Sequence, residues 1–343
     1  MKHEVDLKNL NIRTDLITES LDKIKDKTGI NINNYINNNI EVEEVYVDSN
    51  ASINNNIKEG NYISLLFDDI TDVNNRKNLI NEFVKVLKKL LIKKNLSIDK
   101  SCLIIGLGNS KSTPDSLGPK VADSVIVTRY ISLVTTLDKN YRITSSFSPS
   151  VFGSSGIETS DIVCKLKEIV KPDFIIVIDA LKAMNINKVN KVIQISDIGI
   201  SPGSGVGNKR KEISKDSLGI DVISIGVPTV TDLSTIISDT IKYLYKKISY
   251  TKENLNNPLD KLKTSNKINY LKGDIKELST SEKKQIMGLI GTLTEDELKV
   301  FIQEVLEPIG YNLIVTVKEI DFIIKNLTEV LTTGLNKSLH NIS

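Results

Sequence analysis

The chain has 343 residues, of which 40% are apolar and 26% are charged, and its formal net charge is only +2 at pH 7. At about 150 residues per domain, this length predicts two domains, or one large α/β domain with an appendage. The composition excludes a disordered or membrane-spanning chain, and the balanced charge does not favour nucleic acid or membrane partners. We expect no signal peptide behind Met1 and therefore a cytoplasmic protein.

Two residue types that serve common catalytic sites are scarce. Cys102 and Cys164 are too few for a disulfide framework or a thiolate zinc site, and we expect both to be buried small side chains. The only histidines, His3 and His340, lie near the chain ends, which argues against a histidine triad or a histidine-rich metal site. Acid–base chemistry would then require carboxylates, lysine, tyrosine or a cofactor.

Apolar strands alternate with helical stretches through most of the chain, which predicts an α/β fold with a mostly parallel sheet and helices on both faces. Periodicity places the elements, in chain order, as an amphipathic stretch at 16–27, strands at 42–47 and 62–67, a helix at 78–94, a strand at 102–105, helices at 119–130 and 159–170, strands at 174–178, 192–195 and 222–225, and a helix at 231–247.

The C-terminal part is expected to be helical. Three Ser/Thr-x-x-Glu capping boxes mark helix starts there, and a polar, patternless stretch precedes them. The capping pairs are Ser279 with Glu282, Thr294 with Glu297, and Thr316 with Glu319. The expected domains are an N-terminal extension (1–15), an α/β domain (16–250), a polar connection (251–275) and a C-terminal helical unit packed on the main domain (276–343).

A glycine turn formed by Gly106, Gly108 and Asn109 follows the strand at 102–105. A dinucleotide-binding fingerprint does not fit, because its third glycine would fall at a lysine, and no Walker loop is present. The turn leads instead to Asp115, near the carboxyl end of the strand. In an open α/β sheet, ligands bind in the crevice outside those strand ends.

A second acid, Asp179, directly follows the apolar run 174–178 and is expected on the same rim as Asp115. Either aspartate alone could be a helix cap or a solvated strand end. Two acids on neighbouring strands make coincidence less plausible, although the spacing leaves their separation open. If they approach closely, like charges cannot both ionise cheaply, so the pair would share a proton.

Two glycine-rich loops are expected to line the same cleft. Gly153 and Gly156 open a helix, but their spacing is one residue too short for a nucleophile elbow. The other loop contains Gly203, Gly205 and Gly207 and ends in three cations. Its backbone N–H groups and cations could bind an anion or an acidic peptide, and a flexible surface loop fits the composition equally well.

These blocks resemble the germination proteases of spore-forming bacteria, which degrade small acid-soluble spore proteins. The likeness runs essentially end to end. The matching blocks are Gly106-Leu-Gly-Asn109 with Thr113-Pro-Asp-Ser-Leu-Gly-Pro119, then Phe152–Thr159, Lys171–Leu181, Ile195–Asn208, Ile225–Val230 and Glu304–Leu313. The resemblance implies an aspartic-type endopeptidase of the spore core, a homotetramer without metal or other cofactor, whose two essential aspartates fall on Asp115 and Asp179.

The resemblance also implies a self-processing zymogen with residues 1–15 as its propeptide. Family substrates are cut after an acidic residue that is followed by an apolar one, and Asp15–Leu16 matches that pattern. We expect cleavage there, with the uncut N-terminus obstructing the cleft. Ile17 stands where substrates more often carry alanine, which predicts slow or slightly displaced cleavage. Thr14 could instead simply cap the helix that follows it.

A weaker resemblance, limited to the sheet, is to the hydrogenase maturation proteases. These carry an acid six positions after the Asn of a similar turn, where Asp115 stands, and bind a metal with that acid, an Asp and a His. This chain has no histidine near the site. The alternatives to an aspartic peptidase are therefore a metal-dependent peptidase on the same scaffold and a non-enzymatic nucleotide- or anion-binding regulator.

Overall fold

The chain divides into two units, each built from two separate stretches. The sheet unit comprises Arg13–Val230 and Thr316–Ser343, and the helical unit comprises Met1–Ile12 and Thr231–Val315. The domain ranges expected from the sequence stay a prediction. The computed structural model describes residues 15–22, 24, 26–55, 57–202, 211–254, 275–306, 308 and 313–342.

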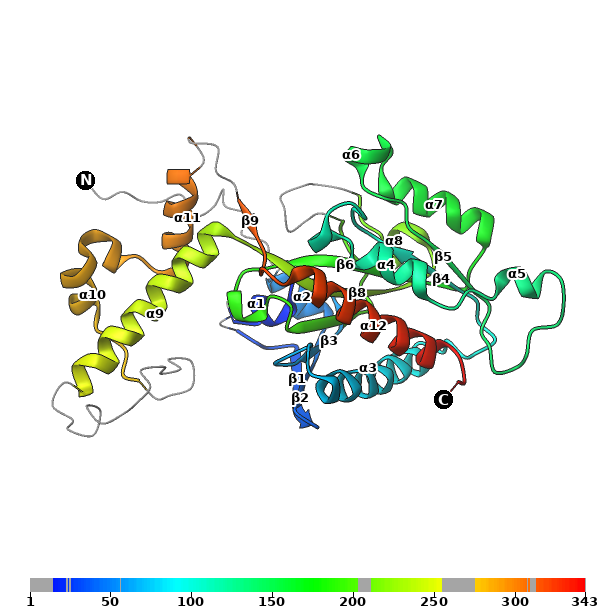
Figure 1. Ribbon diagram of the computed structural model, residues 1–343, viewed down its shortest axis with the longest axis horizontal. Helices are drawn as coiled ribbons and strands as arrows, with labels where there is room; N and C mark the ends of the chain where they lie inside the picture. The colour runs from blue at the N-terminus through cyan, green and yellow to red at the C-terminus, as the bar shows by residue number, and fades with distance from the viewer. Residues whose placement is uncertain are drawn as a thin grey trace. The chain divides into compact units, whose positions relative to one another are not determined.

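The sheet unit is organised around a large sheet with the strand order β1-β2-β3-β7-β8-β6-β4-β5 (Figure 1). Its strands are β1 (Ile30–Asn37), β2 (Ile40–Val47), β3 (Gly60–Leu66), β4 (Cys102–Gly106), β5 (Thr144–Phe147), β6 (Phe174–Ala183), β7 (Val192–Ser196) and β8 (Asp221–Asp232). The strands expected from periodicity are all present. Strands β1 and β5 were not expected. Strand β1 comes from an Asn-rich stretch that offers little β-propensity.

The expected α/β class is confirmed, but the sheet is mixed rather than mostly parallel. Strand β4 pairs in parallel with β5 and β6, whereas the pairs from β1 through β2, β3 and β7 to β8 are antiparallel. The tight β1–β2 connection explains part of the difference. Asn38 and Asn39 adopt φ angles of 48° and 65°, and such a two-residue turn can join only antiparallel strands.

Helices cover both faces of this sheet, as expected. The helices of the sheet unit are α1 (Ile17–Leu21), α2 (Ser49–Asn55), α3 (Val73–Lys93), α4 (Leu117–Ser124), α5 (Arg129–Ser132), α6 (Phe152–Ser155), α7 (Thr159–Val170), α8 (Lys215–Leu218) and α12 (Ile320–Leu339). Among the described helices, none is long and apolar enough to cross a membrane.

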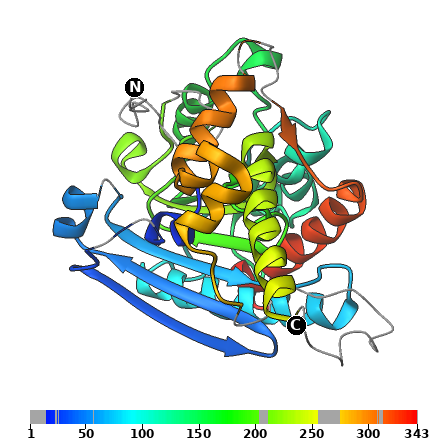
Figure 2. The same cartoon turned by 90° about the vertical axis from the view of Figure 1, so that its left-hand side faces the viewer.

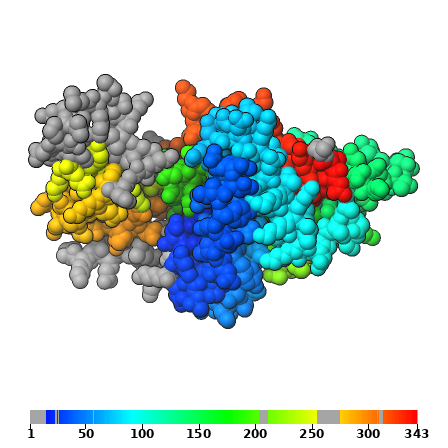
Figure 3. Space-filling view, turned by 90° about the horizontal axis from the view of Figure 1, so that it is seen from below, coloured from blue at the N-terminus to red at the C-terminus, as the bar shows by residue number. Residues whose placement is uncertain are grey.

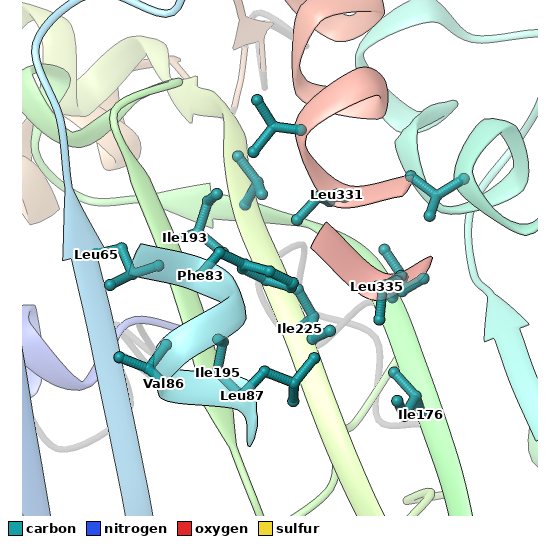
Figure 4. Packing of buried hydrophobic residues seen from close by; sticks show 14 of the residues in the cluster. Leu65, Phe83, Val86, Leu87, Ile176, Ile193, Ile195, Ile225, Leu331 and Leu335 are labelled. Atoms are coloured by element: carbon teal, nitrogen blue, oxygen red, sulfur yellow. The ribbon is translucent and has the colours of Figure 1, made fainter. Parts of the chain in front are cut away.

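The largest hydrophobic cluster lies between the sheet and three helices, α3, α4 and α12. Phe83 of α3 lies at its centre, beside Ile193 and Ile225 from the sheet and Leu331 from α12 (Figure 4). The view from below shows the red residues of α12 beside cyan residues (Figure 3), and α12 packs along α3. The last helix of the chain is therefore part of the core of the sheet unit.

The end of the chain is also tied to this unit by a buried arginine. The guanidinium of Arg142 donates hydrogen bonds to the carbonyl oxygens of Leu96 (3.1 Å) and Leu339 (3.3 Å). The backbone N–H of Arg142 donates to Nδ1 of His340 at 3.1 Å. These bonds anchor the residues that follow α12 against loops between the strands.

The helical unit contains α9 (Leu233–Asn254), α10 (Thr280–Met287) and α11 (Glu295–Leu306). Helix α11 lies alongside α9 (Figure 2). The short strand β9 (Ile314–Val315) pairs with Thr231 and Asp232 at the end of β8. The polar stretch expected to connect the domains lies largely outside the described residues.

Two of the three expected capping boxes are confirmed. The Ser279 N–H donates to Glu282 Oε2 at 2.8 Å, and the Glu282 N–H donates back to Ser279 Oγ. Thr294 and Glu297 exchange the same pair of bonds at 2.7 and 3.3 Å. These reciprocal bonds satisfy backbone donors that the first helical turn would otherwise leave unpaired.

The third expected capping box, at Thr316 and Glu319, is wrong. The Thr316 hydroxyl donates to the carbonyl oxygen of Thr229 at 2.7 Å. Helix α12 begins only after Glu319, which occupies the N-cap without a side-chain bond to the helix. A tertiary hydrogen bond has therefore taken the hydroxyl that the local pattern assigned to the helix start.

The start of α4 lies in backbone contact with the ends of two parallel strands. The Leu107 N–H, just after β4, donates to the carbonyl oxygen of Ile178 in β6 at 2.8 Å. A Cβ on Gly118 would lie 2.2 Å from the Leu107 oxygen and 2.6 Å from the Ile178 oxygen. These distances are far below van der Waals contact, so only glycine fits at this position.

We expect Gly118→Ala to lower the free energy of unfolding by about 1–3 kcal/mol or more, because the added methyl must push backbone apart in a packed region. Urea denaturation measures the change. The matched control is Gly153→Ala, since a Cβ on Gly153 meets no atom within 4 Å, and its stability should stay within about 0.5 kcal/mol of wild type. Equal stability of the two variants would contradict this account of the α4 contact.

Candidate active site

Asp115 lies on a short 3-10 turn (Thr113–Asp115) between β4 and α4. Its carboxylate Oδ2 accepts a hydrogen bond from the Asn109 N–H at 2.8 Å. Gly108 adopts a φ of 119°, and a Cβ there would lie 2.1 Å from the Asp115 carbonyl oxygen. The glycine turn therefore lets the loop fold back on itself and holds the Asp115 carboxylate above the end of β4.

The sequence pattern suggests that Asp179 stands at a solvent-facing strand end, but the structure differs. Strand β6 continues to Ala183, so Asp179 lies within it and is only 7% exposed. Its Oδ1 accepts a hydrogen bond from the Ala180 N–H at 2.9 Å. Leu181 and Ala183 continue the buried alternation beyond the aspartate, and this alternation extends the strand.

The backbone contact at Gly118 places the turn that carries Asp115 beside the residue that precedes Asp179, at the carboxyl end of β4. Asp115 precedes Gly118 by three residues, and Asp179 follows Ile178 directly. The β4–β6 register pairs Gly106 with Ile178, which sets the glycine turn beside Asp179. That the two carboxylates face one rim of the sheet, and that they act together in chemistry, stay predictions.

Asp179 belongs to the face of β6 opposite the large core cluster. Ile176 and Ile178 belong to the cluster under α3 and α12, and Ile175 and Val177 belong to the cluster under α7 and α8. Alternation along a strand gives Asp179 the same face as Ile175 and Val177.

The N-terminal segment Asp15–Glu19 is seated against this part of the sheet. Leu16 is fully buried and packs with Leu181 and Ala183 of β6. The Asp15 carboxylate accepts from the Lys182 N–H at 3.3 Å, and both oxygens of the Glu19 carboxylate accept from the Met184 N–H at 3.0 Å. The bond expected to be cut is thus held on the strand that carries Asp179.

Gln194 of β7 also holds this segment, although it belongs to no recognisable sequence motif. Its Nε2 donates to the Asp15 carbonyl oxygen at 2.8 Å, and its Oε1 accepts from the Ile17 N–H at 2.7 Å. The one signal in the sequence is a glutamine within the apolar run of β7. Such a residue needs buried hydrogen-bond partners, but the pattern does not say which.

The structure describes one of the two glycine-rich loops but not the glycines of the other. Gly153 and Gly156 belong to an exposed turn at α6, and a Cβ on either would meet no atom within 4 Å. Gly203, Gly205 and Gly207 lie outside the described residues. The base of their loop is closed by a β-bridge between Ile200 and Ile213. A cleft-lining role for these glycines stays a prediction.

The cysteines are not placed for chemistry at this site. Cys102 is buried in β4, as expected, and burial raises the pKa of its thiol to about 12. Cys164 is only half-buried, which differs from the expectation of a buried side chain. Within the described part of the chain, no group of three or more His, Cys, Asp or Glu side chains is arranged to hold a metal ion.

Comparison with known proteins points to one family. The family model described as Germination protease matches residues 5–342. Germination proteases from Bacillus cereus (strain ATCC 10987 / NRS 248) and Bacillus mycoides (strain KBAB4) are each 39% identical over 358 residues, covering 99% of this chain and 97% of the relative. The germination protease of Bacillus anthracis (strain CDC 684 / NRRL 3495) is 38% identical over 359 residues, with the same coverage.

A solved structure, that of a NiFe hydrogenase maturation protease from Thermococcus kodakarensis KOD1, is 20% identical with a TM-score of 0.26, covering 42% of this chain and 80% of that chain. The family match and the curated relatives extend over almost every residue described above, including the glycine turn, both aspartates and the seated N-terminal segment. By this match over nearly its whole length, the chain belongs to the germination protease family of peptidases.

Proposed function

We propose that this chain is an aspartic-type endopeptidase that begins the degradation of small acid-soluble spore proteins during spore germination. Family membership supports the peptidase activity. The observation that supports the catalytic assignment is the close approach of Gly118 to Ile178, because Asp115 precedes Gly118 by three residues and Asp179 directly follows Ile178. Protein substrates in the spore core would reach the acids from the face that holds the N-terminal segment.

Two neighbouring carboxylates can divide the work of peptide hydrolysis. Like charges at short range cannot both ionise cheaply, so one aspartate is ionised and the other protonated. The ionised aspartate takes a proton from water as the water attacks the peptide carbonyl carbon, and the protonated one gives its proton to the leaving nitrogen. The Asn109 and Ala180 N–H groups orient the two carboxylates.

The proposal includes synthesis as a zymogen that cuts itself between Asp15 and Leu16. The seating of this bond on β6 and β7 supports it, because Asp15 and Leu16 lie on the sheet face to which Asp179 belongs. An N-terminus that remains attached would keep a protein substrate from the same surface. We further propose assembly as a homotetramer, as the family resemblance implies, which sedimentation of the purified protein would measure.

Asp115→Asn and Asp179→Asn should each lower the rate of spore-protein cleavage by about 10³-fold or more, on the scale of losing a catalytic acid or base. The assay follows cleavage of a purified small acid-soluble spore protein, with and without a chelator. Both variants should keep a melting temperature near that of wild type. Asp138→Asn is the matched control, because that aspartate is exposed and its carboxylate accepts a hydrogen bond from the nearby Asn140 N–H, which an asparagine oxygen can also accept.

Near-normal turnover by either Asn variant would contradict the two-aspartate mechanism. Loss of wild-type activity on adding the chelator would contradict the metal-free form of the proposal and favour a metal-dependent peptidase. Binding of nucleotide without any cleavage of protein would contradict the peptidase function as a whole.

We expect wild-type protein held at mildly acidic pH to lose residues 1–15 and to yield a chain that begins at Leu16. Mass spectrometry of the intact protein checks the cut, and the Asp179→Asn variant, treated in parallel, should keep its N-terminus. The buried position of Leu16 predicts slow cleavage, because the bond is held within packed structure. A preparation that is active on spore protein while its N-terminus is intact would contradict self-processing.

A further inference from the structure

Gln194 holds both sides of the bond at which self-processing is proposed. The residue is only 8% exposed, and its amide spans Leu16 by binding the Asp15 carbonyl oxygen at 2.8 Å and the Ile17 N–H at 2.7 Å. A carbonyl oxygen can only accept and a backbone N–H can only donate, so these two partners fix the orientation of the amide. Nε2 is therefore the group that faces the Asp15 oxygen.

The Asp15 oxygen is the carbonyl oxygen of the Asp15–Leu16 bond itself. We propose that Gln194 is a catalytic residue of self-processing, whose Nε2–H stabilises the negative charge that this oxygen acquires during attack by water. The inference rests on the proposed self-cleavage and adds a third group to the two aspartates. Preorganised donors aimed at such an oxygen contribute through charge that develops only in the transition state.

The surroundings of the bond suit this role. The Lys182 N–H fixes the Asp15 side chain, and the buried Leu16 side chain fixes the other side of the bond. A cavity of about 250 Å³ adjoins them and is lined in part by Gln194 and Gly226. Its lining combines apolar side chains with polar ones such as Ser196 and Ser224, and a cavity of this size with polar partners can admit the attacking water.

The step balances with water as the only co-reactant. The water oxygen bonds to the Asp15 carbonyl carbon and gives a proton to the ionised aspartate, while the carbonyl electron pair moves onto the oxygen that Gln194 Nε2 binds. The C–N bond then breaks, and the Leu16 nitrogen takes a proton from the protonated aspartate. The products are a new carboxyl group on Asp15 and a new amine on Leu16.

Gln194→Glu and Gln194→Met test the donor. An ionised carboxylate has nearly the same shape as the amide but cannot donate to the Asp15 oxygen, and a thioether cannot donate at any pH. We expect self-processing of the full chain to slow by about 10²–10³-fold, as for loss of one oxyanion donor. Gln194→Met, which is uncharged and of similar length, should show a comparable loss and guards against a folding defect in the first variant. The appearance of the chain beginning at Leu16, followed by mass spectrometry, gives the rates.

Lys188→Met is the matched control. Lys188 anchors the same segment through the Thr18 hydroxyl at 2.9 Å and Asp22 at 3.8 Å, but neither bond involves the carbonyl that is attacked. Its loss should slow self-processing less than about fivefold, the scale of a partly exposed ion pair. A rate for Gln194→Glu and Gln194→Met within fivefold of wild type would overturn the proposal.

Gln194 could slow self-processing when replaced simply because it docks the segment. Hydrogen-exchange protection of the segment distinguishes this docking role from a catalytic role. Hydrogen exchange of residues 15–21 is compared between Asp179→Asn and the Asp179→Asn/Gln194→Glu double variant, in which no cut occurs. Gln194→Glu should reduce the hydrogen-exchange protection of residues 15–21 by a factor at least tenfold smaller than the factor by which it slows self-processing. Equal losses would overturn the catalytic role and leave Gln194 as a docking residue.

Cleavage of a spore protein, measured beside self-processing, distinguishes the role of Gln194 from the peptidase function. Wild-type protein that cuts a spore protein but never its own Asp15–Leu16 bond would overturn the role of Gln194 and leave the peptidase intact. Wild-type protein that cuts neither would overturn the peptidase function itself.

Discussion

The backbone of α4 touches the backbone of two parallel strands at Gly118, and the position of the turn that carries Asp115 relative to Asp179 in β6 depends on that contact. Asp115 is carried on the turn that leads into α4, while Asp179 follows the strand residue whose oxygen lies nearest Gly118. A larger residue would separate the helix from the strands and, with them, the two acids. A steric constraint on main-chain atoms therefore determines where the two candidate catalytic side chains are placed relative to each other.

Strand β6 links the candidate site to the N-terminal segment. The N–H groups of Ala180, Lys182 and Met184 alternate along it and donate to the carboxylates of Asp179, Asp15 and Glu19. Backbone donors on one strand thus bind one acid of the site and two acids of the segment. Charged acceptors make such hydrogen bonds stronger than those of an ordinary ladder. The segment is consequently docked by polar groups as well as by the burial of Leu16.

Much of this arrangement could be read from periodicity and turn residues, as with the strand and glycine turn before Asp115 and the helix Thr159–Val170. The local sequence pattern gave wrong predictions where contacts between distant parts of the chain determine the structure. Asp179 interrupts an apolar run, yet alternation beyond it extends β6, and the Thr316 hydroxyl bonds to Thr229 rather than capping a helix. The partners of Gln194 lie almost 180 residues away in sequence, beyond the reach of any local signal.

The place of α12 in the core has a consequence for how the protein is made. Side chains of α12 (Ile320–Leu339) fill the cluster beneath α3, and Arg142 donates a hydrogen bond to the carbonyl oxygen of Leu339. These residues follow every strand of the sheet in chain order and are synthesised after all of them, whereas chains generally fold from the N-terminus as synthesis proceeds. All strands of the sheet unit are therefore made before the helix that covers one of its faces. The core, and with it the candidate site, stays incomplete until α12 has been added to the growing chain.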